Sequence, residues 1–512
     1  MTAPHSYITT TIPYVNARPH IGHALELVQA DVLARFRRGR GDSVRFQAGT
    51  DDNSLKNVLA AEAAGAGVRE FVDRNAQAFL ALGPALSLTV DDVIRTSRDR
   101  RHRPGVERLW QACAAAGDLY RKRYEGLYCT GCEQFYSPAE LRGGRCPEHE
   151  TEPARVAEEN WFFRLSRYGQ QLREAINGGE LRIEPSRRRN EVLAFIDGGL
   201  EDFSVSRPAE RAGGWGIPVP GDASQVIYVW WDALCNYVTA LGYGSDGAGY
   251  REWWASGAAS SRRVHLLGKG VLRFHAVYWP AMLLSSGQPL PTDIVVHDYL
   301  TAGGRKISKS SGAGVPGSDP AALAAEYGTD AVRWWLLREV PRVGDADFTA
   351  ERMIARADDE LANGLGNLVN RVIAMIGRYR EASVPQPEPV PAGAEDLDAA
   401  RRQAGDRIGM ALAEFDFRQA TAAVWAIADE ANRFINRVRP WELAQAERDG
   451  DARAGHRLEA VLSALFGACL TLSVQLTPFL PDAAGRIAAQ CTPRDGRLPP
   501  ASPVFRRLAS AG

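Results

Sequence analysis

The chain has 512 residues, which is too long for one hydrophobic core and predicts roughly two to four structural units. Its composition, 45% hydrophobic and 24% charged, is that of an ordinary soluble globular protein, and no apolar run approaches the roughly 18 residues of a membrane span. The net charge of −1 does not by itself indicate a nucleic-acid partner, although a local basic face is enough for phosphate contacts.

The first part of the chain alternates strand and helix. Residues 6–12 form a β-rich run that ends in a proline-containing break, and residues 43–47 form a second short strand. A helix is predicted over residues 21–36, and another over 55–64. The apolar residues that give the first helix its period are Ala24, Leu25, Val28, Val32 and Phe36. This βαβα opening predicts a parallel sheet with ligand sites at the carboxyl ends of its strands.

The next part of the chain interrupts that pattern. Residues from about 120 to 220 contain cysteines, turns and strand-like runs, and we interpret them as an insertion. Strand character returns at residues 225–229, 263–267 and 293–296, and a glycine-rich loop at 301–305 leads into a basic segment.

From residue 351 onwards the sequence predicts helices, with one proline-rich break at 384–391. The chain stops after these helices without an appended module, which favours a monomer. The expected units are 1–118 and 223–320 as two halves of an α/β domain, 119–222 as the insertion, 321–350 as a linking segment and 351–512 as a helical domain.

The first motif with chemical meaning is His20-Ile21-Gly22-His23, between a strand and a helix. Backbone amides at a helix N-terminus attract anions, Gly22 permits close approach, and the two imidazoles can donate hydrogen bonds to a nucleotide phosphate. The alternative interpretation is two surface histidines near a turn.

The second motif is Lys306-Ile307-Ser308-Lys309-Ser310, in a loop bracketed by glycines. Two lysines three residues apart on a flexible loop can close over a polyphosphate and neutralise charge on leaving pyrophosphate. The alternative is a solvated basic loop.

The third motif is Cys129-x-x-Cys132 followed by Cys146-x-x-His149. Three thiols and an imidazole in two tight pairs predict a closed tetrahedral Zn²⁺ site with a structural role. A redox dithiol at Cys129 and Cys132 is the alternative, and the second pair argues against it. A metal site in place of disulfides, together with the lack of a signal peptide, predicts a cytoplasmic protein.

Together, the first two motifs resemble the two signatures of class I aminoacyl-tRNA synthetases, in order, separation and strand-to-helix context. The surrounding sequence is similar to methionyl-tRNA synthetases from about residue 7 to at least 445. The similar segments are 11–23, 190–193, 215–221, 228–234, 268–269 and 273–280. The resemblance implies an α/β fold with a Rossmann-like catalytic domain, an inserted zinc-knuckle connective domain, a linking segment that contacts the tRNA stem, and a C-terminal α-helical anticodon-binding bundle.

The resemblance also implies an activity. Methionine would attack ATP, with Mg²⁺ and the catalytic residues His20, His23, Lys306 and Lys309 stabilising the polyphosphate, and methionyl-adenylate would then be transferred to methionine tRNA. The implied ATP-binding residues are His20, Gly22, His23, Gly268, Lys269 and Lys309.

A methionine pocket is implied by the same resemblance. Its residues would be Ile12, Tyr14, Trp230, Leu234, Tyr237, Phe274 and His275, with Asp51 receiving the α-ammonium group. An apolar, aromatic-walled slot suits a thioether, and Tyr14 or His275 could donate a hydrogen bond to its sulfur. Without the resemblance, such an aromatic stripe is more typical of a core.

The helical part would read the anticodon. Asn363, Asn367 and Arg371 are spaced four apart, which places them on one helix face, and Trp441 follows on a later helix. Amide groups and an aromatic plane suit unstacked RNA bases. A solvated helix face is the alternative.

Two departures from the resemblance concern the ATP site. Relatives usually carry an acid, His and Gly after Asp51, whereas residues 52–54 here are Asp-Asn-Ser. They also usually carry an aspartate that faces the ribose where this chain has Gly270. We expect altered ATP binding, with Asp52 or another acid compensating, in a divergent enzyme. Two other functions stay open: a paralogue that adenylates another amino acid or uses a non-tRNA acceptor, and a non-catalytic tRNA-binding protein.

Overall fold

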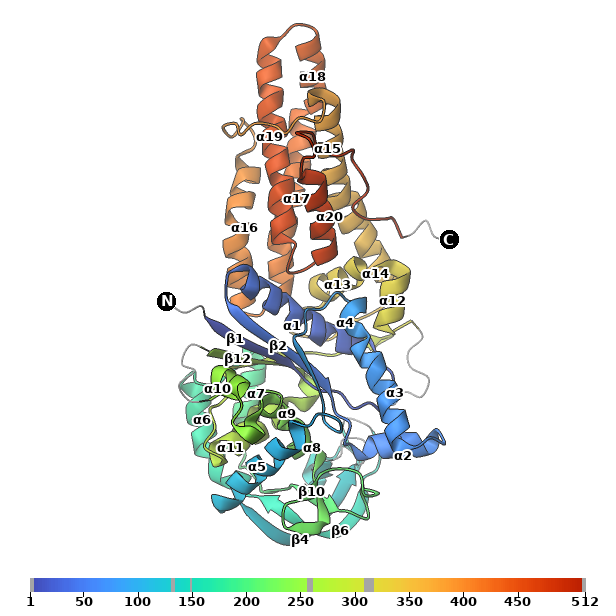
Figure 1. Ribbon diagram of the computed structural model, residues 1–512, viewed down its shortest axis with the longest axis vertical. Coiled ribbons are helices and arrows are strands. Elements are labelled where there is room, and N and C mark those ends of the chain that lie inside the picture. Colours follow the sequence, from blue (N-terminus) through green and yellow to red (C-terminus); the bar gives the residue numbers. More distant parts are fainter. Residues whose placement is uncertain (1–3, 130–133, 148–149, 256–260, 308–316, 509–512) are drawn as a thin grey trace.

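The computed structural model describes residues 4–129, 134–147, 150–255, 261–307 and 317–508 (Figure 1). An α/β part at one end carries a bundle of long helices that projects from it (Figure 1). This arrangement confirms the predicted combination of a Rossmann-like parallel sheet with a helical C-terminal region.

The central sheet has six strands in the order β3-β2-β1-β12-β13-β7, and all its pairs are parallel. The strands are β1 (His5–Thr10), β2 (Ser43–Thr50), β3 (Asp92–Arg95), β7 (Arg182–Glu184), β12 (Ser261–Gly268) and β13 (Asp293–His297). The strand order reverses between β1 and β12, so their carboxyl ends form a topological switch point, where open α/β sheets bind ligands.

Two features of the sheet differ from the sequence-based expectation. The run expected as a strand at 225–229 forms β11 (Asp222–Ile227), which lies outside the parallel sheet. It pairs antiparallel with β10 (Pro218–Val219) and β9 (Ser206–Pro208), because the tight turn before it favours a local hairpin. The short edge strands β3 and β7 were missed, and β7 comes from within the segment expected as an insertion.

The remainder of that segment contains a four-stranded antiparallel sheet. Its strands are β4 (Leu119–Cys129), β5 (Gln134–Tyr136), β6 (Ala154–Phe163) and β8 (Phe203–Ser204), in the order β5-β4-β6-β8. Two helices, α6 (Gly169–Asn177) and α7 (Ser186–Asp197), flank β7 in the chain. A third small sheet joins β14 (Leu300–Ala302) to β15 (Arg305–Lys306) and β16 (Ala346–Asp347).

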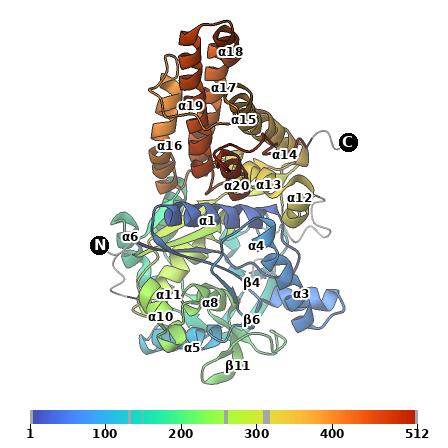
Figure 2. The ribbon, with the colours of Figure 1, turned by 45° about the horizontal axis from the view of Figure 1, so that its top comes forward.

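Helices cover both faces of the central sheet. On one face lies α1 (Ile21–Gly39), which crosses the sheet beneath the bundle (Figure 2). The other helices of the α/β part are α2 (Leu55–Ala63), α3 (Val68–Leu80), α4 (Leu82–Ala85), α5 (His102–Ala115), α8 (Val229–Leu234), α9 (Asn236–Thr239), α10 (Ala248–Trp253), the π-helical η5 (Phe274–Tyr278) and α11 (Trp279–Ser285). Short 3₁₀ turns are η1 (Pro138–Glu140), η2 (Leu165–Tyr168), η3 (Tyr243–Ser245) and η4 (Lys269–Val271).

The C-terminal part is helical, as predicted. It comprises α12 (Pro320–Tyr327), α13 (Thr329–Arg338), α14 (Ala350–Arg356), the π-helical η6 (Ala357–Gly366), α15 (Asn367–Arg380), α16 (Glu395–Ala413), α17 (Phe417–Val438), α18 (Pro440–Arg448), α19 (Ala452–Gln475) and α20 (Pro481–Cys491). Buried side chains of α1, α13 and the bundle belong to one continuous core, so the bundle is fused to the sheet. A second core fills the opposite face of the sheet.

Among the described residues, α19 is long and apolar enough to cross a membrane by length and composition alone, contrary to the expectation that no such run exists. Ten of its residues are buried inside the protein, including Leu458, Leu462, Leu465 and Leu472, and it contacts α15, α16, α17, α18 and α20. The core helix of a bundle passes the same test.

Candidate active site

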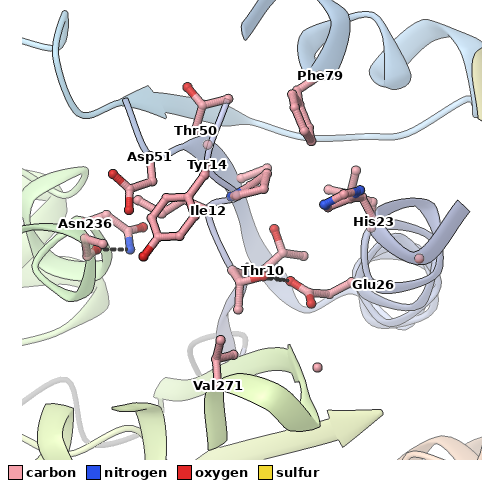
Figure 3. A pocket seen from close by; sticks show the side chains of 18 of the residues that line it. Thr10, Ile12, Tyr14, His23, Glu26, Thr50, Asp51, Phe79, Asn236 and Val271 are labelled. Atoms are coloured by element: carbon pink, nitrogen blue, oxygen red, sulfur yellow. Dashed lines mark hydrogen bonds between the residues drawn. The ribbon is translucent and has the colours of Figure 1, made fainter. Parts of the chain in front are cut away.

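A cavity of about 620 Å³ opens at the carboxyl ends of the central strands. It extends over the switch point between β1 and β12, the start of α1, the ends of β2 and α8, and η5. Figure 3 shows Tyr14, Asp51 and Asn236 on one side of this space and His23, Glu26 and Phe79 on the other. The sequence predicted ligand sites at this edge, and the sheet places most of the predicted residues there.

The two histidines of the first motif shape the start of α1. His20 is its N-cap and accepts a hydrogen bond from the Gly22 backbone N–H at 3.1 Å, while His23 Nδ1 accepts one from the His20 N–H at 3.0 Å. The rings lie 3.9 Å apart, and both residues line the cavity. A Cβ at Gly22 would lie 2.9 Å from His20 Cε1, so only glycine leaves this ring in place. The helix end and both imidazoles therefore meet in one corner of the cavity, an arrangement whose donors and partial positive charge suit an anion.

The predicted methionine residues form an aromatic slot at the other end of the cavity. Trp230 stacks on Phe274 with ring centroids 3.7 Å apart and an interplanar angle of 6°. Tyr14 approaches Trp230 edge-on at 6.2 Å. Ile12 and Leu234 complete the apolar lining. Such a slot accepts an unbranched apolar side chain.

A neutral polar pair closes this slot. The hydroxyl of Tyr237 lies 2.8 Å from His275 Nε2, and His275 Nδ1 lies 2.9 Å from the Val271 carbonyl oxygen. Because a carbonyl can only accept, Nδ1 carries the proton and Nε2 accepts from the tyrosine. Burial lowers the pKa of His275 to about 4, so the ring is uncharged near neutral pH. An uncharged group is compatible with an apolar ligand beside it.

Acidic residues after β2 occupy two different environments. Asp51 lines the cavity and forms a parallel bridge with Tyr14. Asp52, expected as a compensating acid for ATP, is instead fully buried: it accepts hydrogen bonds from Ser97 Oγ at 2.7 Å and from the Arg95 guanidinium at 3.0 and 3.2 Å. Those contacts commit its carboxylate to the protein, and it does not line the cavity.

Asn53, one of the positions that depart from the family pattern, takes part in a hydrogen-bonded network of polar side chains. The Asn53 side-chain amide donates to Asp232 Oδ2 at 2.7 Å, and the other oxygen of Asp232 contacts His102 Nε2. Asp232 is 1% exposed and lies on α8, between Trp230 and Leu234. Asn53 therefore supports the helix that carries part of the slot.

Glu26 and His297 line the cavity but were missed from the sequence. Glu26 Oε1 accepts from the Thr11 backbone N–H at 2.5 Å and from the Thr11 hydroxyl at 2.6 Å. Its second oxygen lies 3.2 Å from His297 Nε2. A sequence signal was available for Glu26, since it lies three residues after His23 and so on the same helix face. No comparable signal identified His297, which reaches the cavity from β13.

The end of β12 brings Gly268, Lys269 and Gly270 to the switch point. Both glycines line the cavity. Lys269 Nζ lies 2.6 Å from Asp345 Oδ1 and 3.7 Å from Asp298 Oδ1, so its ammonium faces two carboxylates beside the cavity rim.

The lysine motif and the cysteines are described only in part. Lys306 belongs to the backbone of β15, opposite Thr301, and buried Ile307 lines the cavity, whereas Lys309 lies outside the described residues. Cys132 and His149 also lie outside them. Among the residues that the structure does describe, no group of three or more His, Cys, Asp or Glu could hold a metal.

The predicted anticodon residues lie in the bundle. Asn363 and Asn367 are exposed, with Asn363 in η6 and Asn367 starting α15, while Arg371 is half-buried on α15. Asn363 Oδ1 accepts a hydrogen bond from Arg507 at 2.7 Å. Trp441, 43% exposed, lies in the first turn of α18 (Pro440–Arg448).

Comparisons with known proteins agree with this geometry. The family model described as "tRNA synthetases class I (M)" matches residues 6–158 and 149–373. A methionine–tRNA ligase of Brucella suis is 38% identical over 529 residues, covering 99% of this chain and 98% of that protein. One of Caldanaerobacter subterraneus is 38% identical over 477 residues, covering 93% of this chain and 72% of that protein.

Solved structures give the same result. The crystal structure of Mycobacterium tuberculosis methionyl-tRNA synthetase bound by methionyl-adenylate is 35% identical, with a TM-score of 0.89, and covers 98% of this chain and 100% of that one. The apo form of the same enzyme is 32% identical, with a TM-score of 0.83, and covers 99% of both chains. A parallel sheet with the histidine pair at its switch point, an aromatic slot and full-length similarity lead to one conclusion: the chain belongs to the methionyl-tRNA synthetase family of class I tRNA synthetases.

Proposed function

We propose that this chain activates methionine with ATP and transfers it from methionyl-adenylate to methionine tRNA. The observation that carries the proposal is the cavity itself, in which an aromatic slot and an anion-binding helix end share one space over the switch point. Methionine in the slot and ATP phosphates at His20 and His23 would bring the amino-acid carboxylate close to the α-phosphorus. Proximity and electrostatic stabilisation supply the rate, without a protein nucleophile.

Individual residues have separate tasks in this proposal. Trp230 and Phe274 hold the methionine side chain, with Tyr237 and His275 beside its sulfur, and Asp51 receives the ammonium group. The N-terminus of α1, with His20 and His23, binds the phosphates. Lys306 and Lys309, together with Mg²⁺ supplied with ATP, would neutralise the leaving pyrophosphate, which moves away from the new acyl-phosphate bond.

Methionine-dependent ATP–pyrophosphate exchange, followed by charging of methionine tRNA, tests this function. We expect both activities, and Lys309→Ala should lower exchange by about 100-fold or more with little change in methionine affinity. Exchange without charging would support a ligase with another acceptor, and tRNA binding without exchange would support a non-catalytic protein. Full activity of Lys309→Ala would contradict the assigned role.

The helical bundle is proposed to bind the anticodon through Asn363, Asn367, Arg371 and Trp441. Asn432 on α17 donates to the Gly364 carbonyl at 3.3 Å, so η6 packs on the helix that leads to Trp441. Trp441→Ala should raise the KM for tRNA about 10-fold, because base stacking contributes roughly 1–3 kcal/mol. Exchange without tRNA should be unaffected, and an equal loss of both activities would contradict the proposal.

A structural Zn²⁺ is proposed at Cys129, Cys132, Cys146 and His149. Burial of two of these thiols supports the proposal: Cys129 and Cys146 are each 1% exposed and share a small buried cluster with Tyr136. Four protein ligands would hold the fold of the insertion and leave no position for catalysis. Purified protein should contain one zinc per chain by elemental analysis, and Cys146→Ser should lose it, whereas Cys113→Ser should not.

The remaining assignments follow from the same function. We propose a cytoplasmic monomer, with 1–118 and 223–320 as the catalytic halves, 119–222 as the connective insertion, 321–350 as a segment that contacts the tRNA stem, and 351–512 as the anticodon-binding part. The molar mass of the purified protein in solution, measured by light scattering, tests whether it is a monomer.

A further inference from the structure

Gly270 contributes no polar side chain to the cavity lining at the switch point. Phosphates at the start of α1 and methionine in the slot would place the ribose between them, beside the ends of β1 and β12. At the end of β12, Gly268 and Gly270 present no side chain to this part of the cavity. Ribose hydroxyls removed from water need a hydrogen-bonding partner from another element.

Tyr299 fills the space that a side chain at position 270 would take. A Cβ built on Gly270 would overlap the Tyr299 hydroxyl, and the next ring atom, Cζ, lies 3.4 Å from that Cβ. Tyr299 follows β13, the strand next to β12, and lines the same cavity. Its hydroxyl is therefore a polar atom at the place left by the glycine.

Neighbouring residues hold Tyr299 in this position. Its backbone N–H donates to Asp345 Oδ1 at 3.0 Å, and its carbonyl accepts from the Ala346 N–H at 3.1 Å. Lys269 Nζ lies 4.4 Å from the centre of the ring while it pairs with Asp345. The ring is thus fixed through both its backbone and a cation–π contact.

The nearby acids are already committed to protein donors. Asp298 accepts from the Gly344 N–H at 2.6 Å and from Arg188. Glu26 accepts two hydrogen bonds from Thr11 on one oxygen, and its other oxygen faces His297. We propose that the Tyr299 hydroxyl hydrogen-bonds a ribose hydroxyl of ATP and takes the place of a carboxylate at position 270, an inference that rests on the proposed function.

Selectivity between ATP and its deoxy analogues tests this contact. In the exchange assay, kcat/KM is measured with ATP, 2′-deoxyATP and 3′-deoxyATP for the wild type and for Tyr299→Phe. Loss of one neutral hydrogen bond should lower kcat/KM for ATP about 3- to 10-fold. For the analogue that lacks the contacted hydroxyl, Tyr299→Phe should leave kcat/KM unchanged. In the variant, the ratio of kcat/KM for ATP to kcat/KM for that analogue therefore approaches one, while the KM for methionine stays the same.

A matched variant controls for loss of a hydroxyl elsewhere. Tyr250→Phe removes a hydroxyl that bonds Gln288 outside the cavity, and it should keep wild-type selectivity. If Tyr299→Phe also keeps wild-type selectivity, the ribose contact is wrong. Absence of methionine-dependent exchange in the wild type would overturn the proposed function as well, so the two failures are distinguishable.

A second pair of variants tests the space argument independently. Gly270→Asp should lower exchange, because its side chain collides with the Tyr299 hydroxyl. Adding Tyr299→Phe removes that atom, so that the new Cβ meets only ring carbons at 3.4 and 3.7 Å. The double variant should then recover at least to the level of Tyr299→Phe alone. If Gly270→Asp alone is as active as the double variant, the two positions do not compete and the proposal fails.

Discussion

Ring packing at Trp230 is the residue-scale feature on which selection of methionine in the proposed pocket should depend. Its indole stacks on Phe274 and meets Tyr14 edge-on, which builds a flat slot from side chains of separate segments. A flat aromatic wall contacts an unbranched thioether along its whole length, whereas a β-branched side chain meets it less fully. The Trp230 ring should therefore contribute more to the free energy of methionine binding than to the free energy of ATP binding.

Replacement of Trp230 by Leu should raise the KM for methionine about 5- to 30-fold, since aromatic packing of this kind contributes roughly 1–2 kcal/mol. The KM for ATP should change less than about twofold. Trp441→Leu provides the control, because that indole lies on the bundle surface and should not alter exchange. Similar increases in both KM values for Trp230→Leu would show that the slot is not specific to methionine.

Buried imidazoles make the stability of the fold pH-dependent. Burial lowers the pKa of His275 to about 4 and that of His265 well below its ordinary value. Between the ordinary pKa of about 6.5 and pH 4, the unfolded chain binds protons that the folded chain does not. The free energy of unfolding therefore falls as the pH falls through this window.

His275→Gln should reduce that pH dependence. For His275 the contribution lost between pH 7 and pH 5 is about 2 kcal/mol, because each pKa unit corresponds to about 1.4 kcal/mol. Urea unfolding of wild type and variant at both pH values measures the difference. Equal losses in the two proteins would mean that this imidazole does not titrate as its burial indicates.

At the scale of elements, the N-terminus of α1 combines helix capping with the proposed phosphate site. The His20 ring accepts from the Gly22 backbone N–H, and the His23 ring accepts from the His20 backbone N–H, so the two side chains form a reciprocal cap. This cap holds the rings in place while the helix end directs its partial positive charge towards the cavity. The histidine motif, predicted from the sequence to be catalytic, is thus also a helix-start signal.

Gly22→Ala should separate these two roles. The new Cβ would lie 2.9 Å from His20 Cε1 and 3.0 Å from the capping Nδ1, so the ring must move and exchange should fall about 10-fold or more. Gly39→Ala, at the other end of α1, meets no atom within 4 Å and should keep full activity. Unchanged activity in Gly22→Ala would show that the position of the His20 ring is not limiting.

At the scale of the whole molecule, a buried ion pair joins the α/β part to the C-terminal helical part. Arg333 on α13 and Asp31 on α1 are both fully buried, with Nη2 and Oδ2 2.8 Å apart. The same guanidinium donates to the carbonyls of Leu86, Pro478 and Phe479. One side chain thus ties α1, the loop after α4 and the segment after α19 together.

Arg333→Met should lower the free energy of unfolding by about 3–5 kcal/mol, because it removes one of the two guanidinium partners of the buried Asp31, which keeps Arg35 at 2.8 Å, and takes the Arg333 donor from three main-chain carbonyls. The exposed pair of Arg433 with Asp429 gives a control: Arg433→Met should cost less than about 1 kcal/mol. Thermal and urea unfolding of both variants measure the two costs. A cost for Arg333→Met as small as that of the control would show that the junction does not depend on this pair.

The sequence alone determined the features that depend on local pattern. Hydrophobic period identified β1, α1, β2 and the helical C-terminal part, and the motifs identified the family, because strand alternation, helix period and turn residues act over a few neighbouring positions. The aromatic slot was predicted residue by residue through the resemblance.

Only the tertiary structure decided how distant segments meet. It placed β11 in a separate hairpin and the short β7 at the edge of the central sheet, since the pairing of such strands depends on non-local partners. It also brought Glu26, His297 and Tyr299 to the switch point and turned Asp52 away into a bond with Arg95. The direction in which a side chain points, and the partner that it contacts, depend on the packing of the whole chain. No local sequence pattern encodes them.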